Sequence, residues 1–403
     1  MKTPQNRSKV VIVGGGFAGI EVARLLAKNP LAEVTLVSTN NCFQYYPNLY
    51  RLVAGASANQ VSIPLDKIIP KNVTLLIDTY IGIDLTQKAI SLKSGSALSY
   101  DYAVLAMGSD ANYFGIEGME AHAQDFLSVK KALALRSSLL QKISDAKNLS
   151  EAEAKELLHI MIIGAGPSGT ELAGALGPFL KEKAKKVGVN PSLIGIDLLD
   201  SSPRVLAALP EHASALVTEQ LQKNGVTVYA NYGVNACDED FLTVTNKNTP
   251  EPTTLKMKAS TVIWTAGTKI SGAFATIPGV VMTEKKRVQV TSTLALPNDD
   301  SVYIAGDGSG TQYSGLAQTA IDQGQYLAKT ISNRIAGVPV SDYVPQPGVF
   351  VIPVGKAWAI LNKKQFVVSG LAAYIIRIIV DARYFLSITS IAQVISMLKK
   401  ETS

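Results

Sequence analysis

A strand, a glycine-rich turn and a helix follow one another near the start of the chain, and this pattern limits the possible folds more than any other feature. The apolar run Val10–Val13 predicts a buried parallel strand, and Ile20–Ala27 predicts a helix. Between them, Gly14, Gly16 and Gly19 have the spacing G-x-G-x-x-G. In such a turn the first glycine permits the tight bend. The second lets the backbone approach a pyrophosphate at the helix N-terminus, and the third lets helix and strand pack closely.

The same pattern returns about 150 positions later. The apolar strand His159–Ile163 is followed by Gly164, Gly166 and Gly169 and then by a helical sequence. A single copy of this motif is a weak signal, but two copies predict two dinucleotide sites in one chain. Two nucleotides suggest an electron relay, with a flavin (FAD) held by one unit and a nicotinamide (NADH) arriving at the other. We therefore expect an α/β fold with two Rossmann-like dinucleotide-binding domains.

Composition narrows the class of protein. A chain of 403 residues has room for two or three domains. Charged residues make up 17% and hydrophobic residues 47%, and the net charge is +6. This balance suggests contact with a membrane surface carrying anionic lipids. The sequence has no array of alternating basic and aromatic residues, so we expect no nucleic acid partner.

Cysteine and histidine usage argues against other redox centres. Cys42 and Cys237 form no C-x-x-C pair, so neither a dithiol loop nor an iron-sulfur cluster has ligands. The three histidines are scattered, and we expect no metal site. Residues 1–9 have no apolar stretch of the kind found in signal peptides, and we expect the protein to face the cytoplasm.

The residue at the end of the second strand of each unit contacts the ribose in folds of this kind. In the second unit, Leu193–Asp200 predicts that strand, and Asp200 would accept hydrogen bonds from a ribose 2′-OH and repel a 2′-phosphate, which favours NADH over NADPH. Arg204 lies nearby and could instead accommodate the phosphate, and Asp200 could simply cap a loop. In the first unit the strand Val34–Val37 is followed by Ser38, a weaker partner for a ribose than a carboxylate.

Several further segments are candidates for the site. Cys42–Tyr50 is aromatic and aperiodic, which predicts a loop that either walls the flavin and a quinone or is merely packed. Glu171 follows Gly169 on the predicted helix, where it could face the nicotinamide or be a solvated first-turn glutamate. Asp307 ends the strand of Ser301–Gly308 and could reach the ribityl chain of a flavin. Gly315–Gln325 predicts the start of a helix whose dipole could stabilise a reduced flavin, and Gln318 and Gln323 could flank one pocket there.

The connecting segments are more ordinary. Val73–Leu92 predicts short strands, Tyr102–Ser109 and Val262–Thr268 predict buried strands that end in glycine, and Asp125–Ser150 predicts a helix.

The last segment, Phe366–Leu398, is strongly apolar. Arg377, Asp381 and Arg383 interrupt it, so it contains no stretch of about 20 uncharged apolar residues that could span a bilayer, and proton pumping is not expected. Phe385, Ile388, Ile391 or Ala392, Ile395 and Leu398 recur at helical spacing, and Lys399 and Lys400 follow. We expect an amphipathic helix at a membrane interface, with a core or homodimer helix as the alternative.

The order of these motifs resembles the pyridine-nucleotide oxidoreductases, and three stretches resemble the type II NADH dehydrogenases, which oxidise NADH with a quinone. They are Gly108–Ile116, Ala317–Gly324, which is similar to A-Q-x-A-x-Q-x-G in that family, and the tail from Val354. The resemblance implies a respiratory-chain flavoprotein on the cytoplasmic side of the cell membrane. It also implies catalytic roles for Glu171, Gln318 and Gln323. Met107, Glu117 and Ser38 depart from the family pattern.

The resemblance divides the chain into an FAD-binding domain (1–115 and 270–345), a connecting helical segment (116–154), an NADH-binding domain (155–269) and a membrane-anchoring or dimerisation region (346–403). The expected nucleotide contacts are Gly14, Gly15, Gly16, Phe17, Ala18, Gly19, Ser38, Thr39, Tyr80, Ala106, Gly108, Asp307, Ala317 and Gln318 for FAD, and Gly164, Gly166, Gly169, Asp200 and Gly267 for NADH.

Three alternatives remain open at this stage. One is a sulfide:quinone oxidoreductase, and another is an NADH oxidoreductase with a different acceptor. The third is a non-catalytic flavoprotein that senses NADH.

Overall fold

The computed structural model describes residues 7–363 and 366–398, and its contacts divide the chain into two compact units. Unit 1 comprises Met1–Gln44, Ser62–Asp110 and Lys269–Gly348, and unit 2 comprises Tyr45–Val61, Ala111–Thr268 and Val349–Ser403. The expected α/β class is confirmed, whereas the assignment of one nucleotide to each domain stays a prediction. Lys399, Lys400 and residues 1–6 lie outside the described residues.

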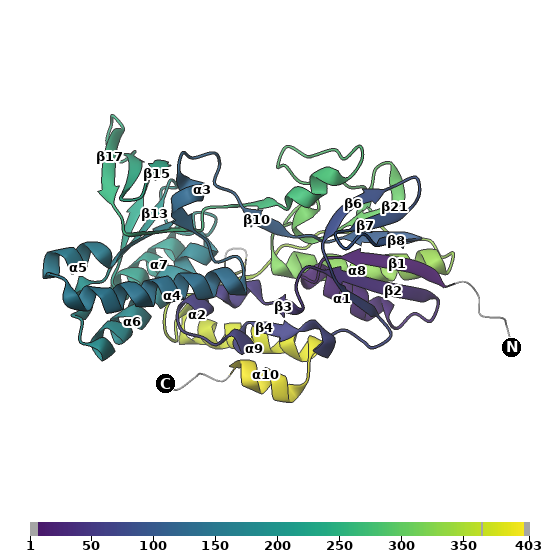
Figure 1. Cartoon of the computed structure of the whole chain (residues 1–403), viewed down its shortest axis with the longest axis horizontal. Coiled ribbons are helices and arrows are strands. Elements are labelled where there is room, and N and C mark those ends of the chain that lie inside the picture. Colours follow the sequence, from purple (N-terminus) through teal and green to yellow (C-terminus); the bar gives the residue numbers. More distant parts are fainter. Residues whose placement is uncertain (1–6, 364–365, 399–403) are drawn as a thin grey trace. The chain divides into compact units, whose positions relative to one another are not determined.

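Unit 1 is built on a six-stranded sheet in the order β20-β21-β9-β1-β2-β5. Of these strands, β1, β2 and β21 are labelled in Figure 1. The central strand β1 pairs in parallel with β2 and β9, so Val10–Val13 is buried on both faces, as the apolar run predicts. The strands of this sheet are β1 (Ser8–Val13), β2 (Ala32–Ser38), β5 (Thr74–Ile77), β9 (Tyr102–Leu105), β20 (Ala295–Leu296) and β21 (Asp299–Ile304).

Two helices of unit 1 pack against each other, α1 (Phe17–Leu26) and α8 (Ala317–Ile335). A Cβ added to Gly324 would lie 2.7 Å from the Ala18 carbonyl oxygen, so glycine allows this close approach. The remaining strands of the unit are β3 (Cys42–Gln44), β4 (Ser62–Pro64), β6 (Tyr80–Asp84), β7 (Ala89–Leu92) and β8 (Ala97–Ser99).

Unit 2 repeats the arrangement with a five-stranded parallel sheet in the order β11-β18-β12-β13-β14. These strands are β11 (Ala123–Gln124), β12 (His159–Ile163), β13 (Gly195–Asp200), β14 (Val226–Ala230) and β18 (Thr261–Trp264). The helices are α2 (Leu49–Val53), α3 (Met119–His122), α4 (Val129–Asp145), α5 (Glu151–Leu157), α6 (Pro167–Val187) and α7 (Glu211–Lys223). A three-stranded antiparallel sheet follows β14, formed by β15 (Tyr232–Cys237), β16 (Phe241–Asn246) and β17 (Thr253–Lys258).

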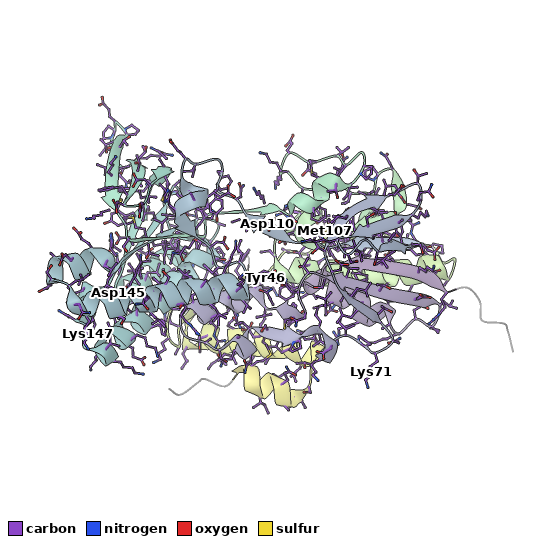
Figure 2. The ribbon with its side chains drawn as sticks, viewed as in Figure 1. Tyr46, Lys71, Met107, Asp110, Asp145 and Lys147 are labelled. Carbon is purple, nitrogen blue, oxygen red and sulfur yellow. The ribbon has the colours of Figure 1, made fainter. Side chains whose placement is uncertain are left out.

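The chain passes between the units near β10 (Ser109–Ala111) and β19 (Thr268–Ile270). Met107 and Asp110 are labelled in Figure 2; Met107 lies between β9 and β10, and Asp110 lies within β10.

The C-terminal part of unit 2 consists of β22 (Phe350–Pro353), β23 (Ala359–Lys363), β24 (Phe366–Gly370), α9 (Leu371–Ile388) and α10 (Ile391–Leu398). One side of α9 is buried through Ala373, Arg377, Asp381, Phe385 and Ile388. The other side, continued on α10, exposes large apolar side chains. We call it the α9–α10 apolar face, and it comprises Leu371, Ile375, Ile378, Ile379, Val380, Leu386, Ile391 and Ile395. Within the described residues, no helix is both long and apolar enough to cross a membrane.

Some predicted elements differ from the structure. Cys42–Tyr50 is not a loop, because β3 pairs with β4 and a 3-10 turn (Tyr46–Asn48) leads into α2. A single helix through 385–398 is also wrong, since the chain leaves the helical conformation at Thr389 between α9 and α10. The apolar residues expected on one face are divided accordingly: Phe385 and Ile388 are buried, and Ile391 and Ile395 are exposed.

Other differences concern boundaries. The first helix begins at Phe17 rather than Ile20, within the glycine turn Gly14–Gly19. The helix expected over Asp125–Ser150 begins at Val129, because the Ser128 hydroxyl caps it by accepting a hydrogen bond from the Lys131 N–H. The predicted strand Leu193–Asp200 begins at Gly195, after a 3-10 turn (Pro191–Leu193).

Candidate functional site

The first glycine turn of unit 1 has the geometry of a pyrophosphate cradle. Gly14 has a φ of 116°, and a Cβ there would collide with the Ala106 carbonyl, while a Cβ on Gly19 would collide with the Gly14 carbonyl. In contrast, a Cβ on Gly16 would have no described heavy atom within 4 Å. Two glycines are thus required by packing, and the third leaves open space at the N-terminus of α1, where backbone N–H groups favour an anion.

The second turn, in unit 2, repeats each of these features. Gly164 has a φ of 106°, and a Cβ there would lie 2.5 Å from the Ala266 Cα. A Cβ on Gly169 would collide with the Gly164 carbonyl, and one on Gly166 would have no described heavy atom within 4 Å. The N-terminus of α6 is therefore a second position at which a pyrophosphate can approach the backbone.

Gly267, the remaining expected contact for NADH, lies just before β19. A Cβ there would lie 2.7 Å from the ring of Phe114. The glycine thus makes room for an aromatic side chain of the same unit.

Asp200 holds the second turn in shape. Its Oδ2 accepts a hydrogen bond from the Ala165 N–H at 2.5 Å, and its Oδ1 accepts one from the Ser202 N–H at 2.7 Å. A carboxylate oxygen can accept more than one hydrogen bond, so Asp200 keeps capacity for ribose hydroxyls. Arg204 donates from Nη2 to the carbonyls of Ala207 and Leu209, at 2.9 and 3.0 Å, so this nitrogen is occupied by the backbone.

Ser38 occupies the corresponding position in unit 1 but turns its hydroxyl toward the protein. The Oγ donates to the Asn40 carbonyl at 2.7 Å and accepts from the Asn40 N–H at 3.3 Å, and the residue is buried. A Cβ on Gly15 would lie 2.6 Å from this Oγ. Ser38 therefore closes the turn after β2 beneath the glycine loop, and Thr39 directly follows it.

Asp307 and Gln323 organise the segment after β21. The Ser109 hydroxyl donates to Asp307 Oδ2 at 2.6 Å, and the Arg287 guanidinium donates to the Asp307 carbonyl. Gln323 is fully buried, accepts at Oε1 from the Gly306 N–H at 2.7 Å and donates from Nε2 to Thr311 at 2.9 Å. These bonds fix the Gly306–Gly308 turn in front of α8.

Gln318 lies apart from Gln323. It is exposed on the first turn of α8 and donates to Asp322 Oδ1 at 2.7 Å. Gln318 is thus on the exposed side of α8 and Gln323 on its buried side, and the expectation that the two glutamines flank one pocket stays a prediction. Ala317 begins this helix, and Tyr80 begins β6, where its ring is buried and its hydroxyl accepts from Thr276 at 3.1 Å.

Glu171 lies in a buried cluster of charges within unit 2, which we call the Arg377 cluster. Its ionic members are Glu171 on α6 and Arg377 and Asp381 on α9, and their exposed fractions are 7%, 8% and 3%. Arg377 Nη1 lies 3.3 Å from Glu171 Oε1, and Arg377 Nε lies 2.9 Å from Asp381 Oδ1. Glu171 is thus not the solvated first-turn glutamate considered from the sequence.

Neutral groups complete the Arg377 cluster. Arg377 also donates to the carbonyls of Val351 and Pro47, at 2.9 and 3.0 Å, and to Asn48 Oδ1 at 2.9 Å. Tyr45 donates its hydroxyl to Asp381 Oδ1 at 2.7 Å, and Asn48 Nδ2 donates to Asp381 Oδ2 at 3.2 Å. The aromatic segment expected as a wall for a flavin therefore supplies hydrogen bonds to α9.

Burial changes the titration of this cluster. Loss of hydration raises the pKa of Glu171 to about 8, although the Arg377 guanidinium acts to lower it. Burial also opposes the charge of Arg377, but the carboxylates of Asp381 and Glu171 prevail and raise the pKa of Arg377. A carboxyl group that titrates near neutral pH is suited to exchange protons during a reaction.

Sequence reasoning treated Arg377 and Asp381 only as interruptions of an apolar segment. Their spacing of four residues, with opposite charges on one helix, was the available signal. Their partners Tyr45 and Asn48 lie more than 300 positions away and could not be identified from spacing.

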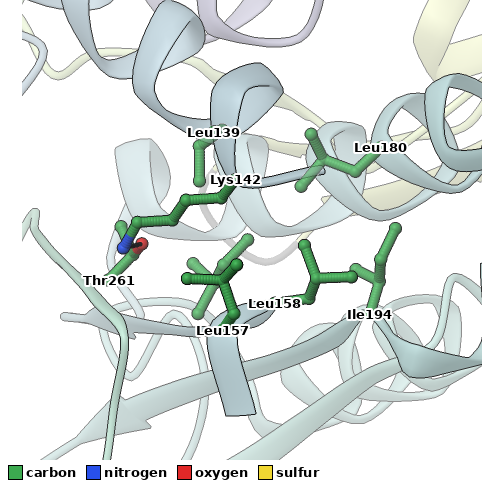
Figure 3. A pocket seen from close by; sticks show the side chains of 8 residues that line it. Leu139, Lys142, Leu157, Leu158, Leu180, Ile194 and Thr261 are labelled. Atoms are coloured by element: carbon green, nitrogen blue, oxygen red, sulfur yellow. Dashed lines mark hydrogen bonds between the residues drawn. The ribbon is translucent and has the colours of Figure 1, made fainter. Parts of the chain in front are cut away.

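A small cavity of about 10 Å³ lies elsewhere in unit 2, between α4, α5, α6 and the sheet (Figure 3). It has room for about one water molecule. Its lining is mostly leucine and isoleucine, and Lys142 at its edge donates from Nζ to the hydroxyls of Ser260 and Thr261 at 2.7 and 2.8 Å. The amine thus ties α4 to β18, and the cavity is a packing feature.

Comparisons with known proteins agree with this geometry. A type II NADH:quinone oxidoreductase from Mycobacterium tuberculosis is 27% identical over 95% of this chain and 85% of its own length. One from Staphylococcus haemolyticus is 25% identical over 84% of this chain and 85% of its own length.

Solved structures share the fold. NDH2 from Plasmodium falciparum in complex with NADH superposes with a TM-score of 0.85 at 18% identity and covers 97% of each chain. The sulfide:quinone oxidoreductase from Aquifex aeolicus superposes with a TM-score of 0.78 at 20% identity, over 94% of this chain and 91% of that chain. The sequence profile of the family described as pyridine nucleotide-disulphide oxidoreductase matches residues 8–324. Two glycine cradles, each at the end of a central strand with parallel neighbours, together with a profile match over most of the sequence, mean that this chain belongs to the pyridine nucleotide-disulphide oxidoreductase family.

Proposed function

We propose that this protein is a type II NADH:quinone oxidoreductase that does not pump protons. The observation that carries the proposal is the pair of open glycine cradles, one at the N-terminus of α1 and one at that of α6. Relatives with this activity in their names align over most of the chain at 25–27% identity. Gly16 and Gly166 leave the room that two dinucleotides require.

The residues of unit 1 fit FAD. The turn Gly14–Gly19 would hold the pyrophosphate, and Asp307, fixed by Ser109 and Arg287, would bind along the ribityl chain. Ser38 would contribute little to the ribose, since its hydroxyl already closes the turn at Asn40. When bound, FAD supplies the chemistry that accepts a hydride and releases electrons singly or in pairs.

The residues of unit 2 fit NADH as the substrate. Gly164–Gly169 would hold its pyrophosphate, and Asp200 would accept hydrogen bonds from the adenosine ribose. Nη2 of Arg204 is occupied by the carbonyls of Ala207 and Leu209, and the carboxylate of Asp200 would repel a 2′-phosphate. This arrangement favours NADH over NADPH.

Glu171 is the proposed proton donor for the reduction of quinone. Quinone reduction to quinol consumes two electrons and two protons, so the protein must deliver protons near neutral pH. A buried carboxyl group whose pKa is raised to about 8 holds its proton at pH 7 and can release it. We propose no proton-transfer role for Gln318 or Gln323, and the fixed bonds of Gln323 suit a residue that shapes the flavin site.

The α9–α10 apolar face is the proposed membrane contact, on the cytoplasmic side. Eight large apolar side chains at helical spacing are exposed there, each by 40% or more. Arg383, which is exposed and lies four residues after Ile379, is available to anionic headgroups. The competing possibility is that a second copy of the chain covers this face in a homodimer. Vesicle flotation at protein concentrations where the chain is monomeric separates lipid binding from dimerisation.

The deciding experiment is anaerobic stopped-flow absorbance on the purified protein with its flavin. NADH should bleach the flavin rapidly, and a soluble quinone should restore the absorbance rapidly. Bleaching without a response to quinone would refute the quinone assignment, and no bleaching would refute NADH as the donor. A sulfide:quinone reaction would need cysteine at the flavin, so Cys42→Ser tests it. The proposed function expects this variant to keep the NADH-driven turnover of the wild type.

A further inference from the structure

The Arg377 cluster has one cation and two carboxyl groups, and the two carboxyl groups are bonded unequally. Asp381 accepts from Arg377 Nε at 2.9 Å, from the Tyr45 hydroxyl at 2.7 Å and from Asn48 Nδ2 at 3.2 Å. Among the described residues, Glu171 has Arg377 as its side-chain hydrogen-bond partner, at the longer distance of 3.3 Å. The donors of the cluster thus converge on Asp381.

The charges of the cluster do not balance if both carboxyl groups are ionised. One guanidinium against two carboxylates leaves a net negative charge in a space where all three side chains are at least nine-tenths buried. An uncompensated buried charge is costly, so one carboxyl group retains a proton. A carboxylate accepts from several donors, as Asp381 does, whereas a protonated carboxyl group needs fewer donors around it.

We propose that Asp381 is a positioning residue for quinone reduction, because it takes up the charge of Arg377 and leaves Glu171 as the protonated acid of the cluster. The inference rests on the proposed function, in which Glu171 donates a proton. Asp381 bonds to Arg377, and its negative charge also favours the protonated form of Glu171. The helix that carries the apolar face thereby also sets the protonation state of a residue on α6.

The other titratable groups near Glu171 are consistent with this assignment. After burial, the negative charge of Glu171 is the next cause that raises the pKa of Tyr50 of α2, whereas Arg51 acts to lower it. For Tyr45, burial is followed by the negative charge of Asp381, and Tyr384 adds to the rise of the pKa. Burial raises the pKa values of Tyr45 and Tyr50, so both hydroxyl groups remain neutral at physiological pH. Neither tyrosine therefore competes with Asp381 as the anion of the cluster.

The test is the pH profile of a single half-reaction in Asp381→Asn. The enzyme is reduced with NADH, and its reoxidation by a soluble quinone is followed by stopped flow between about pH 5.5 and 9.5. In the wild type, the rate should fall as pH rises through about 8, where Glu171 loses its proton. In Asp381→Asn, Arg377 is free to pair with Glu171, and the falling limb should move about 1 to 3 pH units lower.

The matched controls separate charge from structure. Asp381→Glu keeps the negative charge, and the rate of reoxidation should fall at a pH close to that of the wild type. Glu182→Gln removes an exposed carboxylate from the same helix as Glu171 and should leave the limb unchanged. A folded Asp381→Asn variant with the wild-type limb would overturn the inference. A wild-type enzyme that quinone does not reoxidise would instead refute the proposed function.

Infrared titration keeps the inference testable if Asp381→Asn does not fold. A protonated carboxyl group has a distinct C=O stretching band, which the wild-type holoenzyme should show near pH 7. Loss of that band in Glu171→Gln places the proton on Glu171, as proposed. A band that persists in Glu171→Gln would place the proton on another carboxyl group and overturn the inference.

Discussion

Replacing Arg377 with methionine should destabilise unit 2, and more strongly at high pH than at low pH. The guanidinium donates to both carboxyl groups, to Asn48 and to two backbone carbonyls, and it is 8% exposed. Methionine fills similar volume but leaves Glu171 and Asp381 without their cation. Removing one partner of a buried ion pair costs about 3 to 5 kcal/mol, and we expect a loss of that size near pH 8.

The pH dependence follows from Glu171. Arg377 lowers the pKa of Glu171 in the folded protein, so its removal widens the gap between the folded value and the unfolded value of 4.5. A folded pKa above the unfolded one means that stability is kept below the unfolded value and lost as pH rises. The difference between Arg377→Met and the wild type should therefore grow as the pH rises through and above about 8, where Glu171 ionises in the wild type but not in the variant, and should be constant at lower pH.

Tryptophan fluorescence during urea unfolding measures this effect for unit 2 specifically. The chain has two tryptophans, Trp264 and Trp358, and both belong to unit 2. Arg383→Met, on the exposed side of the same helix, is the matched control and should change the free energy of unfolding by less than about 0.5 kcal/mol. A loss below about 1 kcal/mol in Arg377→Met at pH 8, or a loss that does not depend on pH, would contradict this reasoning.

Three further predictions follow from other parts of the chain. Asp200→Ala should raise the KM for NADH roughly 10- to 100-fold with a smaller change in kcat, because it removes charge-assisted hydrogen bonds. Steady-state kinetics with NADH and NADPH measures this change. An equal change of KM in an exposed control such as Asp238→Ala would contradict the prediction. Ile379→Glu should abolish flotation with anionic vesicles, whereas Ile81→Glu, an exposed isoleucine of unit 1, should not. The hydrogen bond to Asp197 raises the pKa of His159 in the folded protein. The contribution of this bond to stability, about 1 kcal/mol or less, is therefore present below pH 6.5 and lost as the pH rises through the folded pKa. The free energy of unfolding of His159→Gln should show no such step.

The parts of the fold that were predictable from the sequence are those with local causes. The two glycine turns are specified by spacing, and each is bounded by an apolar strand, so β1, β12 and the helices after them follow directly. Asp200 at the end of β13 was likewise predictable, because its place depends on strand length and not on distant partners. Boundaries such as the start of α1 were less accurate, since the helix begins within the glycine turn itself.

The Arg377 cluster was not predictable for the opposite reason. Tyr45 and Asp381 are 336 positions apart, and neither has a local pattern that points to the other. The segment Cys42–Tyr50 was expected to be a loop because it lacks periodicity. Its first residues pair with β4, and Tyr45 and Asn48 beyond them bond to α9. Long-range pairing of this kind decides the structure of short aperiodic segments and leaves no trace in their spacing.

The charged residues within the apolar tail have a physical meaning that hydropathy alone does not reveal. A helix that only lies on a lipid surface is not stabilised by an arginine and an aspartate on its buried side, because both side chains must lose their hydration. Their cost is offset by five donors and acceptors on two other segments, which are Tyr45–Asn48 and β22, and these bonds fix the rotation of α9 about its axis. A fixed rotation is what keeps Ile375, Ile379 and Leu386 on the exposed side. The same buried pair that orients Glu171 therefore also orients the α9–α10 apolar face, and substitutions at Arg377 should impair flotation with vesicles as well as quinone reduction.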